Sequence, residues 1–214
     1  MAIMNIFALS GLINGILSLT LGTLVYLRQR KNPVTQTFFL FNAVVAIWAL
    51  SYWQWLNQET SEAALFWTRL LTIGSIFIPI TFLHWVLTLL DKAKFKQHLL
   101  IFGYLVAAFF LLVSFSDHFV SSVGPAFGFP FWPKPGLFYH FFLFGSFLGF
   151  PTLAFIELFR SFRAATGQRR LQLKFVIIGT LIGFVGGSTN FPLWYGIPFP
   201  PIANILVSAY PVVF

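Results

Sequence analysis

The chain has 214 residues, of which 58% are hydrophobic, 20% aromatic and 8% charged. Soluble domains carry about 25% charged residues, so this composition excludes an ordinary soluble protein and indicates a membrane protein. The net charge of +8 comes from basic residues at the ends of apolar runs, where membrane topology and anionic lipid headgroups explain them. Nucleic acid is therefore not an expected partner. The absence of cysteine excludes disulfides, cysteine-ligated metals and thiol nucleophiles within this segment.

Seven apolar runs are candidates for membrane-spanning helices, which need about 20 mostly apolar residues each. We expect spans at residues 3–27, 34–56, 63–90, 99–115, 137–159, 171–191 and 202–214. The predicted fold class is an all-α membrane protein, a bundle of seven transmembrane helices that forms one domain over residues 1–214. The last run would make roughly 20 Å of helix at 1.5 Å per residue, which is short of the far interface. We therefore expect a truncated seventh helix and a fragment of a longer protein.

Basic residues gather at alternate ends of these runs. The loops after the first, third and fifth spans hold all but two of the 13 lysines and arginines: Arg28, Arg30 and Lys31; Lys92, Lys94 and Lys96; and Arg160, Arg163, Arg169, Arg170 and Lys174. Short basic loops beside membrane helices stay in the cytoplasm. We therefore expect the N-terminus outside, the C-terminus in the cytoplasm and a seventh helix that runs inward. The lipid bilayer is the first expected partner.

The opposite side of the membrane is expected to hold aromatic loops and helix ends. Residues 116–136 form the longest connection, rich in glycine, proline and aromatic residues, and loops of that length are usually functional or disordered. At the end of the second span, Tyr52, Trp53 and Trp55 are typical of an interfacial aromatic belt. Small residues at helical spacing predict close helix packing by the first and sixth spans: Gly11, Gly15, Ser18 and Gly22, and Gly179, Gly183 and Gly187.

Ionisable side chains inside the spans are candidate functional residues. Arg69 lies about one and a half turns inside the third span, where it can snorkel to the outer surface, pair with Glu62 or bind an anionic ligand. Glu157 is placed to pair with Arg160 at i,i+3, and a proton-sensing carboxylate is the alternative. His84 is either a packed, hydrogen-bonded histidine or a pH switch. The four histidines are dispersed, so no metal site is expected.

The segment between the sixth and seventh spans is the most distinctive of the chain. Its sequence is NFPLWYGIPFPP at residues 190–201, where the prolines deny backbone donors and break the helix. Asn190, Trp194 and Tyr195 lie in this hinge, and Asn204 follows it. These residues either only end one helix and begin the next, or they line an outer pocket for a hydrophobic or lipid-like molecule.

The chain resembles the N-terminal seven-helix sensor region of bacterial membrane histidine kinases. The resemblance rests mainly on LIGFVGGSTNFPLWYGIPFPPIANILVSAYPVV at residues 181–213, above all on residues 186–204. It is supported by RQRKNPV at residues 28–34, Trp-Ala-Leu at residues 48–50, the Trp67 and Arg69 pair, and His84 followed by an aromatic residue. The similarity covers nearly the whole chain.

This resemblance implies the signal-input region of a two-component sensor kinase in the bacterial inner (cytoplasmic) membrane. It implies a relay through the seventh helix, a homodimer, and a cytoplasmic response regulator reached through domains that follow residue 214. ATP and Mg²⁺ belong to those domains, and no cofactor or catalytic residue is expected in this segment. The expected ligand-binding or relay residues are Arg69, Trp67, Asn190, Trp194, Tyr195 and Asn204, and the possible pH-sensitive residues are His84 and Glu157.

Two other functions are alternatives for a bundle of seven membrane helices. A small seven-helix transporter or lipid-binding membrane protein without kinase output would need inward-facing polar groups near mid-bilayer, and few candidates are present. A retinal receptor is a weaker alternative, because no lysine lies between Phe175 and Phe214 to form a Schiff base.

Overall fold

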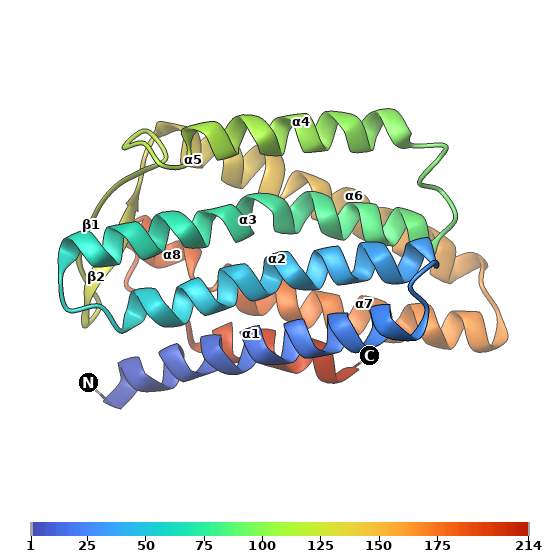
Figure 1. Ribbon diagram of the computed structural model, residues 1–214, viewed down its shortest axis with the longest axis horizontal. Coiled ribbons are helices and arrows are strands. Elements are labelled where there is room, and N and C mark those ends of the chain that lie inside the picture. Colours follow the sequence, from blue (N-terminus) through green and yellow to red (C-terminus); the bar gives the residue numbers. More distant parts are fainter. Residues whose placement is uncertain (1, 214) are drawn as a thin grey trace.

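The computed structural model describes residues 2–213 and the side chains of residues 6–207, so the predicted span end at Phe214 lies outside the described residues. The helices lie side by side along one axis and alternate in direction (Figure 1). The elements in chain order are α1 (Ala2–Arg28), α2 (Pro33–Leu56), α3 (Ser61–Leu89), α4 (Gln97–Val113), β1 (Val120–Ala126), β2 (Phe129–Pro135), α5 (Leu137–Phe141), the π-helix η1 (Phe142–Phe147), α6 (Gly149–Ala164), α7 (Gly167–Ser188), α8 (Phe191–Trp194) and the 3₁₀-helix η2 (Ile202–Val213).

Five helical segments of the described chain are long and apolar enough to cross a bilayer: Ile6–Arg28, Pro33–Leu56, Ser61–Leu89, Leu137–Ala164 and Gly167–Trp194. They coincide with the first, second, third, fifth and sixth predicted spans. The fourth predicted span is the shorter helix α4, with 17 residues. The seventh is not the predicted α-helix but the 12-residue 3₁₀-helix η2. The structure is thus a membrane-type helical bundle.

Local sequence signals place the starts of α2 and α3. Asn32 caps α2 by accepting a hydrogen bond from the Val34 N–H at 2.9 Å, and Pro33 occupies the first helical position, where no N–H is needed. The Thr60 hydroxyl caps α3 by accepting from the Ala63 N–H at 3.3 Å. Each cap satisfies a backbone donor that the helix itself leaves open.

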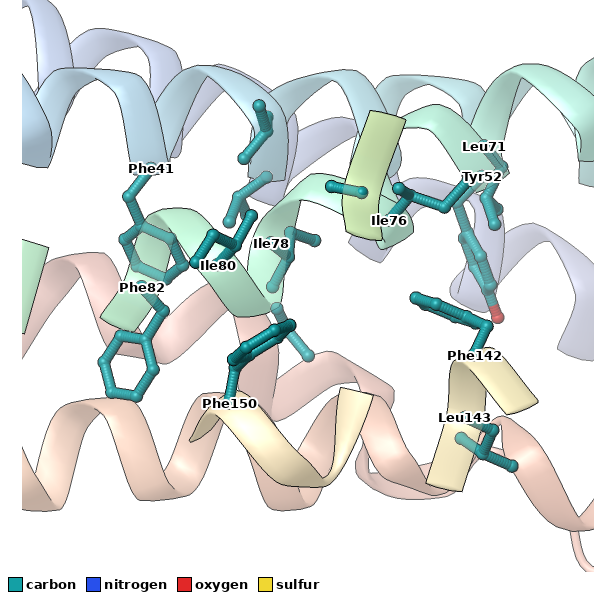
Figure 2. Packing of buried hydrophobic residues seen from close by; sticks show 14 of the residues in the cluster. Phe41, Tyr52, Leu71, Ile76, Ile78, Ile80, Phe82, Phe142, Leu143 and Phe150 are labelled. Atoms are coloured by element: carbon teal, nitrogen blue, oxygen red, sulfur yellow. The ribbon is translucent and has the colours of Figure 1, made fainter. Parts of the chain in front are cut away.

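Helix α3 lies at the centre and contacts α2, α4, α6 and the hairpin. Figure 2 shows Phe41 of α2 directed at Phe82 of α3, with ring centroids 5.5 Å apart. The backbones of α2 and α3 touch where a Cβ on Gly74 would lie 2.6 Å from the Trp48 nitrogen. The predicted small face of α1 also packs closely, because a Cβ on Gly11 would lie 2.9 Å from the Ala49 carbonyl oxygen of α2.

The fifth predicted span is one continuous helical run with a π-helical segment in its middle. The Leu148 N–H donates to the Leu143 carbonyl at 3.0 Å, the i to i−5 spacing of a π-turn. The span therefore reaches from Leu137 to Ala164 as α5, η1 and α6, five residues beyond its predicted end. Such bulges occur often at functional sites, and this one brings Phe147 into the bundle interior.

Residues 116–136 are not an irregular loop but contain an antiparallel hairpin, β1 with β2. Phe127 and Gly128 form its turn with φ of 47° and 82°, as two-residue hairpin turns require. The Trp55 indole N–H of α2 donates to the Phe131 carbonyl at 2.7 Å, and Trp132 is 1% exposed. The hairpin thereby covers the end of the bundle where the N-terminus lies (Figure 1).

Candidate functional site: an aromatic cavity in the bundle

A cavity of about 80 Å³ lies between α2, α3, α5, η1, α7, α8 and η2, on the half of the bundle nearer the hairpin. Half of the residues that line it are aromatic: Phe41, Trp48, Tyr52, Trp55, Tyr139, Phe147, Phe184, Phe191 and Trp194. Gly183 and Gly187 of α7 lie one turn apart and leave the room that larger side chains would fill. A water molecule needs only about 10–15 Å³ on this scale, so the cavity can hold a small molecule.

Lining side chains with hydroxyl or amide groups differ in their hydrogen bonding. The Thr180 hydroxyl donates to the Val176 carbonyl at 2.7 Å, and the Ser75 hydroxyl donates to the Leu71 carbonyl at 3.3 Å. By contrast, the Tyr52 hydroxyl and Asn190 Oδ1 are buried and have no hydrogen-bond partner among the described residues. Figure 2 shows the Tyr52 hydroxyl at the inner tip of a ring that reaches into the bundle. Buried polar groups are nearly always paired, so these two are candidates for contact with a bound molecule.

Asn190 also joins α7 to the final element. Its Nδ2 donates to Asn204 Oδ1 of η2 at 2.8 Å and to the Gly187 carbonyl at 3.0 Å. Both partners are acceptors, which fixes Nδ2 on that side and leaves Oδ1 as the unpaired atom. Asn204 is buried, and a Cβ on Gly186 would lie 2.6 Å from the Ala203 oxygen. Helix α7 and η2 therefore touch where Asn190 lines the cavity.

The hinge aromatics occupy different places. The Trp194 ring lines the cavity and stacks on Tyr139 of α5, with centroids 4.2 Å apart and an interplanar angle of 7°. Tyr195 turns away from the cavity, and its hydroxyl makes a hydrogen bond of 2.9 Å with His140 Nδ1. Partial burial raises the pKa of Tyr195, because it disfavours the charged phenolate. The structure thus brings Asn190, Trp194 and Asn204 together but places Tyr195 outside.

Arg69 and Trp67 do not line the cavity. The Arg69 guanidinium forms an ion pair with Asp117 at 2.6 Å and donates to the Val120 carbonyl at 3.3 Å. Pairing with Glu62 was one predicted alternative, and the structure replaces it with a residue from the segment before the hairpin. Since Asp117 is about 80% exposed, Arg69 reaches outward, as a snorkelling side chain does. It fastens the hairpin segment to α3.

Glu157 and His84 also lie apart from the cavity. The Glu157 carboxylate pairs with Arg160 at 3.6 Å, as predicted, and more closely with Lys92 and Lys96 at 2.7 Å each. Two ammonium groups compensate its charge, an arrangement that fastens the α3–α4 loop to α6. His84 Nδ1 makes a hydrogen bond of 2.9 Å with the Tyr104 hydroxyl of α4. Within the described side chains, no three histidine or carboxylate groups meet as a metal site.

Tyr52 and Trp55 are lining residues that the sequence pattern does not single out. Their place at the end of the second span predicts an interfacial belt, yet Tyr52 is 1% and Trp55 3% exposed, and both face the interior. Interfacial and interior aromatic residues at a helix end look alike in a sequence, because the distinction depends on which neighbour covers them. Here the hairpin, at residues where the sequence predicts a loop, covers that end of α2.

Comparison with known proteins assigns the family. The profile described as the N-terminal 7TM region of histidine kinase matches residues 11–212. No curated protein and no solved structure matches the chain significantly. Together with the five apolar helical segments, the family match shows a multi-pass membrane protein and a sensor region of the two-component type. The chain belongs to the family formed by the N-terminal seven-transmembrane region of histidine kinases.

Proposed function

We propose that the chain is the signal-input region of a two-component sensor kinase in the bacterial cytoplasmic membrane, and that it relays an outer-side or intramembrane signal through its final helix to cytoplasmic output. One observation supports the proposed relay. Asn190 lines the cavity and donates to Asn204 of η2, so a change at the cavity wall acts directly on the last element. A ligand shifts the equilibrium between two helix packings only if it binds them with different affinity.

Seven crossings, with the N-terminus outside, fit the arrangement. The basic loops after α1, α3 and α6 lie at one end of the bundle, and the hairpin lies at the other (Figure 1). At 1.5 Å per residue, α4 spans about 26 Å, and at about 2.0 Å per residue the 3₁₀-helix η2 spans about 24 Å, so each nearly crosses a 30 Å core. Eleven basic residues at one end then set the orientation.

The kinase modules, the homodimer and the response regulator belong to the same proposal. In it, ATP and Mg²⁺ bind the cytoplasmic modules, and this segment changes their activity through η2. The transporter alternative would instead require the chain to function without such output.

The test measures autophosphorylation by the full-length gene product in membranes. Asn204→Leu removes the acceptor of the Asn190 amide while keeping a side chain of similar size. We expect basal output to change at least about threefold, since losing one buried hydrogen bond is worth roughly 1 kcal/mol. Asn57→Leu is the matched control, because the exposed Asn57 amide donates to the Trp53 carbonyl of its own helix. Equal output from both variants and the wild type would contradict the relay.

A further inference from the structure

We propose that the aromatic cavity is a binding site for a small flat apolar molecule with one hydroxyl-type group, such as a phenol, which accepts a hydrogen bond from Tyr52 and donates one to Asn190 Oδ1. This inference rests on the proposed function, because it names the class of signal that the input region would bind. The binding itself can be tested on the chain alone.

The cavity walls select the body of the molecule. Rings from α2, α5, η1, α7 and α8 surround the space, and the Trp194 ring already stacks on Tyr139 at 4.2 Å. Aromatic faces favour stacked or edge-on contact with another flat ring. The described lining contains no charged side chain, which disfavours an ionic ligand, since a charge buried without a partner is costly.

The unpaired polar atoms select the functional group. Asn190 offers a ligand only an acceptor, Oδ1, because its Nδ2 already donates to Asn204 and Gly187. The Tyr52 hydroxyl lacks a partner and can donate. One hydroxyl group on a ligand supplies both a donor and an acceptor, which are the two partners that Asn190 Oδ1 and the Tyr52 hydroxyl lack. Water could do the same, but it lacks the flat apolar surface that would pack against the aromatic walls.

The position of Asn190 links occupancy to the relay. A donor on Oδ1 polarises the same amide whose Nδ2 holds Asn204 of η2. Gly187, which lines the cavity, also accepts from this amide through its carbonyl. A ligand in the cavity therefore acts on the contact between α7 and η2 through Asn190 alone.

The experiment uses ¹⁹F NMR of two probes, 4-fluorophenol and 4-fluorotoluene, which are alike in size and differ in the hydroxyl group. Each is titrated into the purified chain in detergent micelles, and binding is measured from the protein-dependent shift and linewidth. We expect the wild type to bind 4-fluorophenol at least about fivefold more tightly than 4-fluorotoluene, and Tyr52→Phe to reduce that preference to less than about twofold. Tyr104→Phe, whose hydroxyl lies outside the cavity and pairs with His84, should keep the preference.

A second variant tests the location. Gly187→Leu fills the cavity from α7, where an added Cβ would lie 3.8 Å from Val207 among the described residues, and it should abolish specific binding of both probes. Gly145→Leu, which adds the same side chain at an exposed site with nothing within 4 Å, is its control. If Gly187→Leu does not fold, Val45→Phe fills the cavity from α2.

An unchanged preference in folded Tyr52→Phe, or equal binding by wild type and a folded cavity-filled variant, overturns the proposal. Binding without any effect on kinase output would instead contradict the proposed function and leave the site standing.

Discussion

At the scale of single residues, most buried hydroxyl groups of the bundle bond to their own helix. Thr68, Thr81 and Thr180 each donate to a carbonyl four residues earlier. In a low-dielectric interior an unpaired polar group is costly, and this local solution is open to any threonine on a helix. A tyrosine hydroxyl lies too far from its own backbone to bond a carbonyl four residues earlier. The Tyr52 hydroxyl therefore depends on a molecule in the cavity for a hydrogen-bond partner.

Replacing Tyr52 by phenylalanine should therefore not lower the stability of the empty protein. The removed hydroxyl has no partner among the described residues, and its loss relieves a desolvation cost. Tyr104→Phe should lower the free energy of unfolding by about 1 kcal/mol, because it leaves His84 Nδ1 without its 2.9 Å partner. Thermal unfolding of both variants in the same detergent measures the difference. A loss of stability in Tyr52→Phe as large as in Tyr104→Phe would show that Tyr52 has a partner.

The carboxylate of Glu157 should be the most costly ionisable group to neutralise. Glu157→Gln leaves Lys92 and Lys96 without their partner at 2.7 Å, and we expect a loss of about 1.5–3 kcal/mol, limited by the partial exposure of both lysines. Arg160→Gln removes an exposed partner at 3.6 Å and should change stability by less than about 0.5 kcal/mol. Chemical denaturation in detergent compares them. Similar losses in both variants would mean that the lysines do not hold Glu157.

At the scale of elements, α2 and α3 pack backbone against backbone at Gly74. Gly74→Ala would place a Cβ 2.6 Å from the Trp48 backbone nitrogen, and a backbone atom cannot rotate away as a side chain can. We expect a loss of about 1–3 kcal/mol. Gly149→Ala at the start of α6, with nothing within 4 Å, should be neutral or stabilising by up to about 1 kcal/mol. Thermal unfolding ranks the two variants, and a neutral Gly74→Ala would exclude direct backbone contact.

The same elements show which features a sequence can predict. Apolar length and the caps at Asn32 and Thr60 depend on local chemistry, so five long segments lie close to their predicted bounds. The hairpin was missed because prolines at 125, 130, 133 and 135 argue against strands, and they are tolerated here only because a two-stranded ribbon has two open edges. The π-segment at 142–147 depends on packing against neighbours, which no local pattern records.

At the scale of the whole molecule, charge and cavity lie at opposite ends. Two of the three basic loops are joined to each other, because Lys92 and Lys96 bind Glu157 of α6 and Arg169 of α7 donates to the Leu89 carbonyl at 2.5 Å. The cavity lies toward the hairpin end, lined by Trp55 of α2 and Trp194 of α8.

The sequence predicted the cavity only in part. Asn190 and Trp194 stood out beside the prolines, whereas Tyr139 and Phe184 resemble any other aromatic residue of an apolar run.

This polarity predicts which residues an impermeant reagent reaches. The chain contains no cysteine, so a single introduced cysteine reports one position. Lys134 in β2 and Lys94 in the α3–α4 loop are both exposed lysines at opposite ends of the bundle. With the basic loops in the cytoplasm, a membrane-impermeant maleimide added to intact spheroplasts should label Lys134→Cys at least about tenfold faster than Lys94→Cys. Permeabilised cells, in which both should react, control for folding and reactivity. Faster labelling of Lys94→Cys would reverse the orientation, and a final helix directed inward, on which the proposed relay depends, would then be impossible.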